Sequence, residues 1–168
     1  MIKKITNSAV FPLVPSYTKE QDVDYDSILS YVNYLQGNGA SILMTTAGTT
    51  QFHLLTSEEV LEINSLCAKS FVGTLIAGIK PLSLREAKKQ IINHNERLAG
   101  RDVCLILLYP ERYYDDETIV NYFNELADAS DFPVLIHGMF MRRGNGGTYN
   151  FTADLINKIA EHPNIIGM

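Results

Sequence analysis

Short apolar runs recur along the chain at a nearly constant interval. They begin near Ala9, Ser41, Thr74, Val103, Val134 and Ile165, with separations of 32, 33, 29, 31 and 31 residues. Each run is apolar over its whole length rather than at alternate positions, which is typical of strands buried on both faces. The interval therefore predicts a series of parallel strands, each followed by one helix.

Between these runs, apolar residues recur at the three- and four-residue spacing of amphipathic helices. Five such segments follow one another, with these residues on their apolar faces: Ile28, Val32 and Leu35; Val60, Ile63 and Cys67; Ala87, Ile91, Asn95 and Leu98; Ile119, Phe123, Leu126 and Ala127; Leu155, Ile156, Ile159 and Ala160. Thr56 and Glu59 have the spacing of a capping box at the start of the second helix. Gly100 marks the expected end of the third helix, and the acidic residues 115–117 the start of the fourth.

Two α/β architectures have this repeat. A doubly wound open sheet of five or six strands fits 168 residues, whereas a (β/α)8 TIM barrel needs about 250. The last apolar run, 165–168, ends within what looks like a central strand, and eight units of about 31 residues come to the barrel length. We therefore expect residues 1–168 to form a single domain, the first five and a half units of a (β/α)8 barrel, with the rest of the barrel beyond residue 168.

Composition narrows the class of partner. The chain is 46% hydrophobic and 20% charged with a net charge of −5, so a nucleic acid is not the expected partner. No run of about 18 apolar residues is present, so no membrane span is expected. Cys67 and Cys104 lie in apolar segments without metal-type spacing. The composition predicts a cytoplasmic protein with reduced thiols, and we expect neither a metal nor another cofactor.

Candidate functional residues follow the strands, where parallel α/β proteins hold their sites. The turn Thr45–Thr50 can present hydroxyls and backbone N–H groups to a small anion, or be a polar turn without a ligand. His137 suits proton transfer or is a core histidine with satisfied hydrogen bonds. Arg142 can bind a carboxylate or be exposed, and Lys80 can form an imine or act as a solvated or capping lysine. Together these groups indicate a small anionic substrate, most simply a carboxylate. The remaining histidines are expected to be structural: His53, His94 and His162.

The order of features along nearly the whole chain resembles one family. The segments that carry the resemblance are Phe11–Pro15, Asp24–Leu35, Gly39-Ala40, Gly48-Thr49-Thr50, Thr56–Glu59, Ala77-Gly78, Pro133–Leu135 and Glu161–Met168. They resemble the dihydrodipicolinate synthase / N-acetylneuraminate lyase family of class I aldolases, which are (β/α)8 barrels. The Gly48-Thr49-Thr50 segment resembles that family's Gly-Thr-Thr-Gly-Glu motif.

The resemblance implies a lysine directly after Met168, which forms an imine with pyruvate or another 2-keto acid. The protonated imine then accepts electrons while a carbon–carbon bond is made or broken. It also implies that Gly48 and Thr50 bind the substrate carboxylate and that the Thr49 hydroxyl belongs to a proton relay. Arg142 matches the arginine that binds the polar group of the second substrate. Because the family is commonly tetrameric, a homo-oligomer, dimer or tetramer, is expected.

Several residues depart from the family pattern. Gln51-Phe52 stands where the family has Gly-Glu, and His137 stands where a catalytic tyrosine is expected. In Pro110–Tyr114 the tyrosine normally lent to a neighbouring subunit is displaced, and Asn145–Tyr149 looks like an insertion. These departures argue against a true dihydrodipicolinate synthase and favour a divergent keto-acid aldolase of unknown substrate.

Three hypotheses follow for function. The favoured one is a carbon–carbon lyase or synthase that uses a 2-keto acid through a lysine imine. The second is a family paralogue that has lost aldolase chemistry and acts as a binding or regulatory protein. The third is a stand-alone doubly wound binding module of 168 residues.

Overall fold

The computed structural model of the protein describes residues 5, 7–110, 115–138, 141–142, 148–149 and 152–168. Within this part, six strands form one parallel sheet whose spatial order is the order of the chain. The strands are β1 (Val10–Pro12), β2 (Ile42–Met44), β3 (Thr74–Ile79), β4 (Val103–Leu108), β5 (Val134–His137) and β8 (Ile165–Gly167). Each strand begins at the predicted residue or one residue after it, so the interval of apolar runs located all six.

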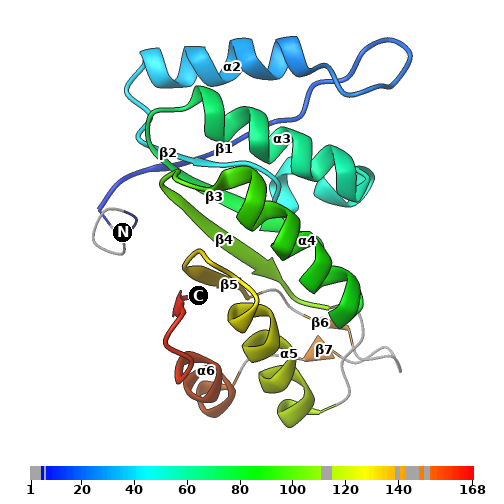
Figure 1. The fold of residues 1–168 in the computed structure, drawn as a ribbon, viewed down its shortest axis with the longest axis vertical. Coiled ribbons are helices and arrows are strands. Elements are labelled where there is room, and N and C mark those ends of the chain that lie inside the picture. Colours follow the sequence, from blue (N-terminus) through cyan, green and yellow to red (C-terminus); the bar gives the residue numbers. More distant parts are fainter. Residues whose placement is uncertain (1–4, 6, 111–114, 139–140, 143–147, 150–151) are drawn as a thin grey trace.

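Five helices pack against this sheet in chain order. They are α2 (Tyr25–Gly37), α3 (Ser57–Ser70), α4 (Leu84–Leu98), α5 (Asp116–Asp128) and α6 (Ala153–Ala160). Figure 1 shows them side by side along one face of the sheet. A doubly wound fold has helices on both faces and a point where the strand order reverses. The observed order has no reversal within the described strands. The doubly wound alternative is therefore wrong, and the chain is part of a parallel α/β barrel.

The two faces of the sheet bury different side chains. One face packs against the helices through a large core that includes Leu75, Leu105 and Val134. The other face carries a smaller cluster, Ile42, Ile76 and Ile106, with Met44 and Leu135 packed against it. In a barrel the second face is the inner one. Burial on both faces explains why the runs are apolar at every position rather than at alternate ones.

The predicted helix ends are confirmed by their hydrogen bonds. Thr56 N–H donates to Glu59 Oε2 at 2.6 Å, and Glu59 N–H donates to Thr56 Oγ1 at 3.2 Å, which completes the capping box. Thr118 N–H donates to the N-cap Asp115 at 2.7 Å. Gly100, two residues after α4 ends, has a φ of +76°, a conformation that favours glycine.

The predicted helical faces are buried at nearly every position. Ile28, Val32 and Leu35 of α2 contact the core, as do the named residues of α3 and α5. Asn95 of α4 and Ile156 of α6 are only partly buried, and Ala160, which was expected on the apolar face of α6, is exposed. Ala160 is the last residue of α6, and its small side chain loses little by exposure.

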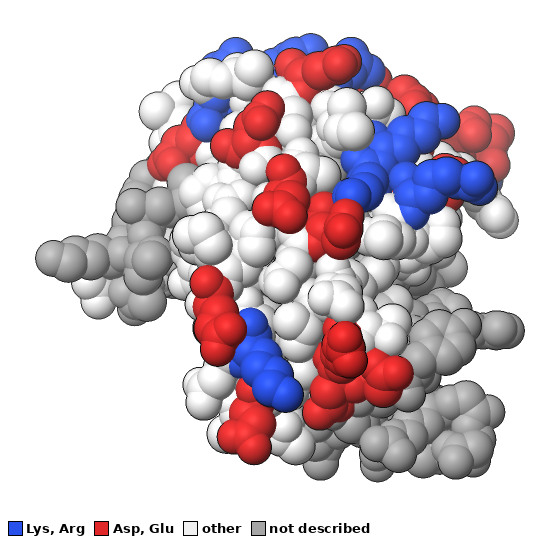
Figure 2. Space-filling model, turned by 60° about the horizontal axis from the view of Figure 1, so that its bottom comes forward, with Lys and Arg blue, Asp and Glu red and all other residues white. Residues whose placement is uncertain are grey.

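On the face drawn in Figure 2, the described Lys and Arg side chains are interspersed with Asp and Glu. Two ion pairs join neighbouring helices, Lys88 with Glu125 and Arg97 with Glu62. None of the described helices is long and apolar enough to cross a membrane. The described residues also contain no group of three or more His, Cys, Asp or Glu that could hold a metal ion.

Candidate active site

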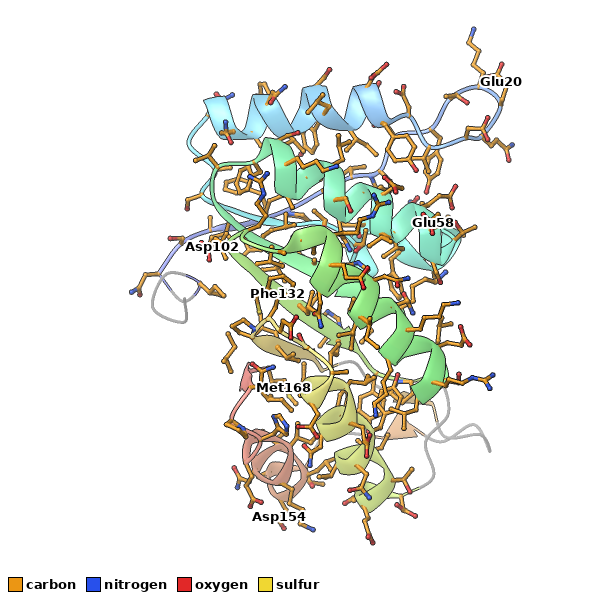
Figure 3. The ribbon with its side chains drawn as sticks, viewed as in Figure 1. Glu20, Glu58, Asp102, Phe132, Asp154 and Met168 are labelled. Carbon is orange, nitrogen blue, oxygen red and sulfur yellow. The ribbon has the colours of Figure 1, made fainter. Side chains whose placement is uncertain are left out.

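The carboxyl ends of the parallel strands lie along one edge of the sheet. Figure 3 shows Glu58, in the first turn of α3, at the opposite end of the sheet from Asp102 and Phe132. Asp102 and Phe132 precede β4 and β5, so they mark the amino ends of the strands. We call the edge on the side of Glu58 the carboxyl edge. The turn after β2, the end of β3 and the end of β5 all belong to it.

The turn after β2 is closed by the side chain of Thr50. Gly48–Thr50 forms a single 3-10 turn, η1. Ala47 N–H donates to Thr50 Oγ1 and the same hydroxyl donates to the Ala47 carbonyl, both at 2.6 Å. Thr50 N–H donates to that carbonyl at 3.0 Å. The buried Thr50 hydroxyl therefore shapes the turn.

The groups of this turn that face outward are those of its first two residues. Thr49 is exposed and Gly48 is partly exposed. The first N–H groups of a helical turn have no acceptor within that turn. The amides of Gly48 and Thr49, with the Thr49 hydroxyl, are thus positioned to receive a small anion. The carboxylate-binding role of Gly48 and Thr50 and the relay role of Thr49 stay predictions.

Gln51 and Phe52, which stand where the family has Gly-Glu, form a less polar segment than that motif. Gln51 has a φ of +55°, in the left-handed region, and begins a second 3-10 turn, η2 (Phe52–Leu54). The Phe52 side chain is buried and meets the ring of the exposed His53 edge to face, with centroids 5.9 Å apart. An aromatic side chain therefore occupies the position where the family motif has a carboxylate.

Lys80, directly after β3, supports the structure of this edge. Its ammonium group donates to the carbonyl of Leu55, which follows η2. Its backbone N–H lies 3.4 Å from Oε1 of Gln90 on α4. Lys80 thus connects the end of β3 to the segment after the turn, which favours the capping interpretation over imine formation.

His137 ends β5 on the inner face. Leu135, two residues earlier, packs in the inner cluster, whereas Val134 and Ile136 pack against the helices. His137 pairs with Leu108 of β4 and is partly buried. Its Nδ1 is buried and has no hydrogen-bond partner among the described residues. Burial disfavours the imidazolium form and lowers the pKa of His137 below its ordinary value of 6.5. A neutral imidazole with a free nitrogen can accept or donate one proton.

Three sequence predictions concern residues that are described only in part. Arg142 belongs to a short ribbon in which β6 (Met141–Arg142) pairs antiparallel with β7 (Thr148–Tyr149). The expected insertion therefore ends in a strand, which the sequence did not predict. The Arg142 side chain, residues 145–147 of the insertion and the displaced tyrosines at 113 and 114 lie outside the described residues.

The two thiols and two of the other histidines are structural. Burial raises the pKa of Cys67 and of Cys104 to about 12, so both are protonated and unreactive near neutrality. His162 Nε2 lies 3.0 Å from Asp128 Oδ1, and its Nδ1 accepts from Asn164 N–H at 3.2 Å. His94 is fully buried between helices and strand ends. The prediction of structural roles for His94 and His162 agrees with these contacts.

One polar group at this edge was missed by the sequence analysis. Asn64 of α3 is fully buried and contacts the two threonines that precede the turn. It follows Val60 by four residues, so it lies on the apolar face of α3. Gln90 and His94 occupy equivalent buried positions on α4. Polar residues on a helical face that should be apolar were the available signal.

Together, the fold and the carboxyl edge define the class of protein. It is a parallel α/β barrel segment that carries, at its strand ends, a turn suited to binding a small anion and the imidazole of His137. The family model for the dihydrodipicolinate synthetase family matches residues 4–168. The chain belongs to the dihydrodipicolinate synthetase family, and the sequence prediction of this family is confirmed.

Known relatives resemble the chain over nearly all of its length. The 4-hydroxy-tetrahydrodipicolinate synthase of Phocaeicola vulgatus is 26% identical over 159 residues, 93% of this chain and 52% of that protein. The structure of N-acetylneuraminate lyase from Mycoplasma synoviae, crystal form II, superposes with a TM-score of 0.79 at 25% identity, covering 95% of this chain and 53% of that one. Dihydrodipicolinate synthase from Acinetobacter baumannii, chloride-inhibited and complexed with pyruvate, has a TM-score of 0.80 at 22% identity, covering 95% and 54%. The chain thus spans about half the length of the relatives it matches.

Proposed function

We propose that the protein is a class I aldolase-type lyase or synthase that binds pyruvate or another 2-keto acid as a lysine imine. The family match over residues 4–168 carries this proposal. It is supported by the position of the Gly48–Thr50 turn and His137 at the carboxyl edge, where barrel enzymes hold their active sites. The Acinetobacter relative, whose structure holds pyruvate, indicates the kind of substrate.

In this proposal the chain's own residues bind the keto acid and move protons. The imine-forming lysine is the one that the family places directly after Met168, at the end of β8. The amides of Gly48 and Thr49, shaped by Thr50, receive the carboxylate. His137 exchanges a proton with the substrate carbon or oxygen next to the imine. Arg142 receives the polar group of the second substrate.

The first experiment traps the imine in the full-length protein. Incubation with pyruvate and sodium borohydride should add one covalent pyruvate-derived mass to the peptide that follows Met168. The control is the same protein treated with borohydride alone. Failure to form any adduct with a panel of 2-keto acids would exclude imine chemistry.

A second candidate is a paralogue that binds a keto acid without turning it over. The aromatic Phe52 in place of the family carboxylate and the imidazole of His137 in place of the phenol favour this reading. Calorimetry together with borohydride trapping separates the two functions, because the paralogue binds pyruvate but forms no borohydride-stable adduct. No nucleic acid or membrane partner is part of either proposal, and a cytoplasmic location and a homodimer or homotetramer stay predictions.

Substitution of Thr50 tests the turn. Thr50→Val keeps the shape of the side chain but removes the hydroxyl that bonds twice to Ala47, so the turn loosens and keto-acid binding weakens by about tenfold. The measurement is the pyruvate Kd by calorimetry in the full-length protein. Thr50→Ser retains the hydroxyl and should keep the affinity within about twofold of the parent. Equal affinities for the parent and Thr50→Val would remove Thr50 from the site.

A further inference from the structure

The Asn64 amide uses all of its hydrogen-bonding capacity at the carboxyl edge. Its Oδ1 accepts from the hydroxyl of Thr45 and from that of Thr46, the latter at 2.9 Å. Its Nδ2 donates to the carbonyl of Gly78 at 3.2 Å and lies 2.9 Å from Nε2 of His94. An amide has two acceptor sites and two hydrogens, so every site is filled. Three of its four partners contribute side chains, Thr45 and Thr46 directly after β2 and His94 on α4, and Gly78 of β3 contributes its carbonyl.

His94 sets the orientation of this amide. Its Nδ1 lies 2.7 Å from the Gln90 carbonyl, which can only accept, so Nδ1 carries the hydrogen. In the neutral ring Nε2 is then an acceptor, and it receives a hydrogen from Asn64 Nδ2. Burial lowers the pKa of His94 and keeps the ring neutral. A flipped amide would place its oxygen against the Gly78 carbonyl and the His94 lone pair, so the observed orientation is the only one that bonds throughout.

The amide connects directly to the turn. Thr46 Oγ1 also accepts from Gly78 N–H at 3.1 Å and lies 3.0 Å from the Gly78 carbonyl oxygen, so Asn64 and Gly78 together hold the Thr46 side chain. The next residue, Ala47, is the one to which Thr50 bonds through its hydroxyl and its N–H. Hydrogen bonds therefore run from His94 through Asn64 to Thr46. Thr46 is covalently joined to Ala47, the first residue of the turn that carries Gly48 and Thr49.

We propose that Asn64, oriented by His94, is a positioning residue that pre-organises the Ala47–Thr50 turn for the carboxylate of the keto acid. It acts from behind the site: Asn64 and His94 are fully buried, whereas Gly48 is partly exposed and Thr49 is exposed. The part that concerns the keto acid rests on the proposed function. The part that concerns the turn does not, because its ordering can be measured without any ligand.

The test compares two pairs of matched variants in the full-length protein. Asn64→Ala removes the amide behind the turn, and Asn164→Ala removes an amide of similar bonding at the other edge. Asn164 precedes β8 and donates to the carbonyls of Ala127, Ser130 and Phe132 at 3.0–3.1 Å. The milder pair is Thr46→Val against Thr74→Val, since the Thr74 hydroxyl bonds to Asp102 at 2.7 Å at the amino edge. This pair serves if the asparagine variants do not fold.

The first readout is hydrogen exchange of the backbone amides of residues 47–51, measured by mass spectrometry without ligand. Asn64→Ala and Thr46→Val should speed this exchange by about tenfold or more relative to the parent, and their controls should not. The second readout is steady-state kinetics with pyruvate. Asn64→Ala should raise KM by about tenfold with a smaller change in kcat, and Asn164→Ala should leave KM unchanged.

The outcomes separate the positioning role from simple stability. If Asn64→Ala and Asn164→Ala lower the midpoint of urea unfolding alike and exchange at 47–51 is unaltered in both, Asn64 is only structural and the proposal is overturned. If exchange accelerates only in the Asn64 and Thr46 variants while the parent protein shows neither binding nor imine with any keto acid, the positioning of the turn stands and the proposed function fails. His94→Leu combined with Asn64→Ala should accelerate exchange no more than Asn64→Ala alone, because the two residues act as one unit.

Discussion

Gly78→Ala should destabilise the protein by more than about 4 kcal/mol, or prevent folding. A Cβ atom built on Gly78 would lie 1.6 Å from the carbonyl oxygen of Thr46 and 2.5 Å from its carbonyl carbon. Both are backbone atoms, so no side-chain rotation relieves the overlap. The two strands would have to separate at the carboxyl edge, which would break the bonds between Gly78, Thr46 and Asn64.

The matched control for this prediction is Gly37→Ala. No heavy atom lies within 4 Å of a Cβ built on Gly37, the last residue of α2. Alanine is the better helix former, so this variant should be neutral or more stable by roughly 0.5–1 kcal/mol. The measurement is urea unfolding followed by circular dichroism for both variants and the parent. A Gly78→Ala protein that unfolds at the parent's midpoint would show that the strands do not approach this closely.

The sequence predicted the positions of the strands and helices but not the order of the strands in the sheet. Strand positions and helix starts depend on local patterns, so the interval of apolar runs and the Thr56–Glu59 capping box located them. The strand order does not depend on local pattern, because a doubly wound sheet and a barrel are built from the same repeat. Only the chain-ordered pairing from β1 to β8 decided between them.

The contacts of the candidate site were harder to predict for a related reason. Asn64 bonds to Thr46 and to His94, which are 18 and 30 residues away. Nothing in the local sequence of α3 indicates which partners a buried amide will meet. The Thr50 hydroxyl has a local partner, but Gly-Thr-Thr turns bind anions and close upon themselves with the same residues. The three-dimensional structure shows that this hydroxyl bonds to Ala47.

The strongest effect on catalysis is expected from His137. If His137 transfers a proton at the imine, His137→Phe should lower kcat by about 10²- to 10⁴-fold and change the keto-acid Kd little. The phenyl ring keeps the bulk of the side chain on the inner face next to Leu108 but has no nitrogen. The matched control is His53→Phe, because the His53 imidazole is exposed on η2 and, among the described residues, its ring contact is with Phe52 rather than with the turn or His137.

The pH profile gives an independent check on this role. Burial lowers the pKa of His137, so the ring is neutral at pH 7 and gains its proton only below the ordinary value of 6.5. Activity that requires a neutral base is therefore full above 6.5 and falls as the pH drops through the lower pKa of the folded protein. His137→Tyr, which restores the phenol of the family, should retain more turnover than His137→Phe and lose this acid limb. Equal losses of kcat and affinity in His137→Phe, or an unaltered acid limb in His137→Tyr, would instead make His137 a packing residue of the inner face.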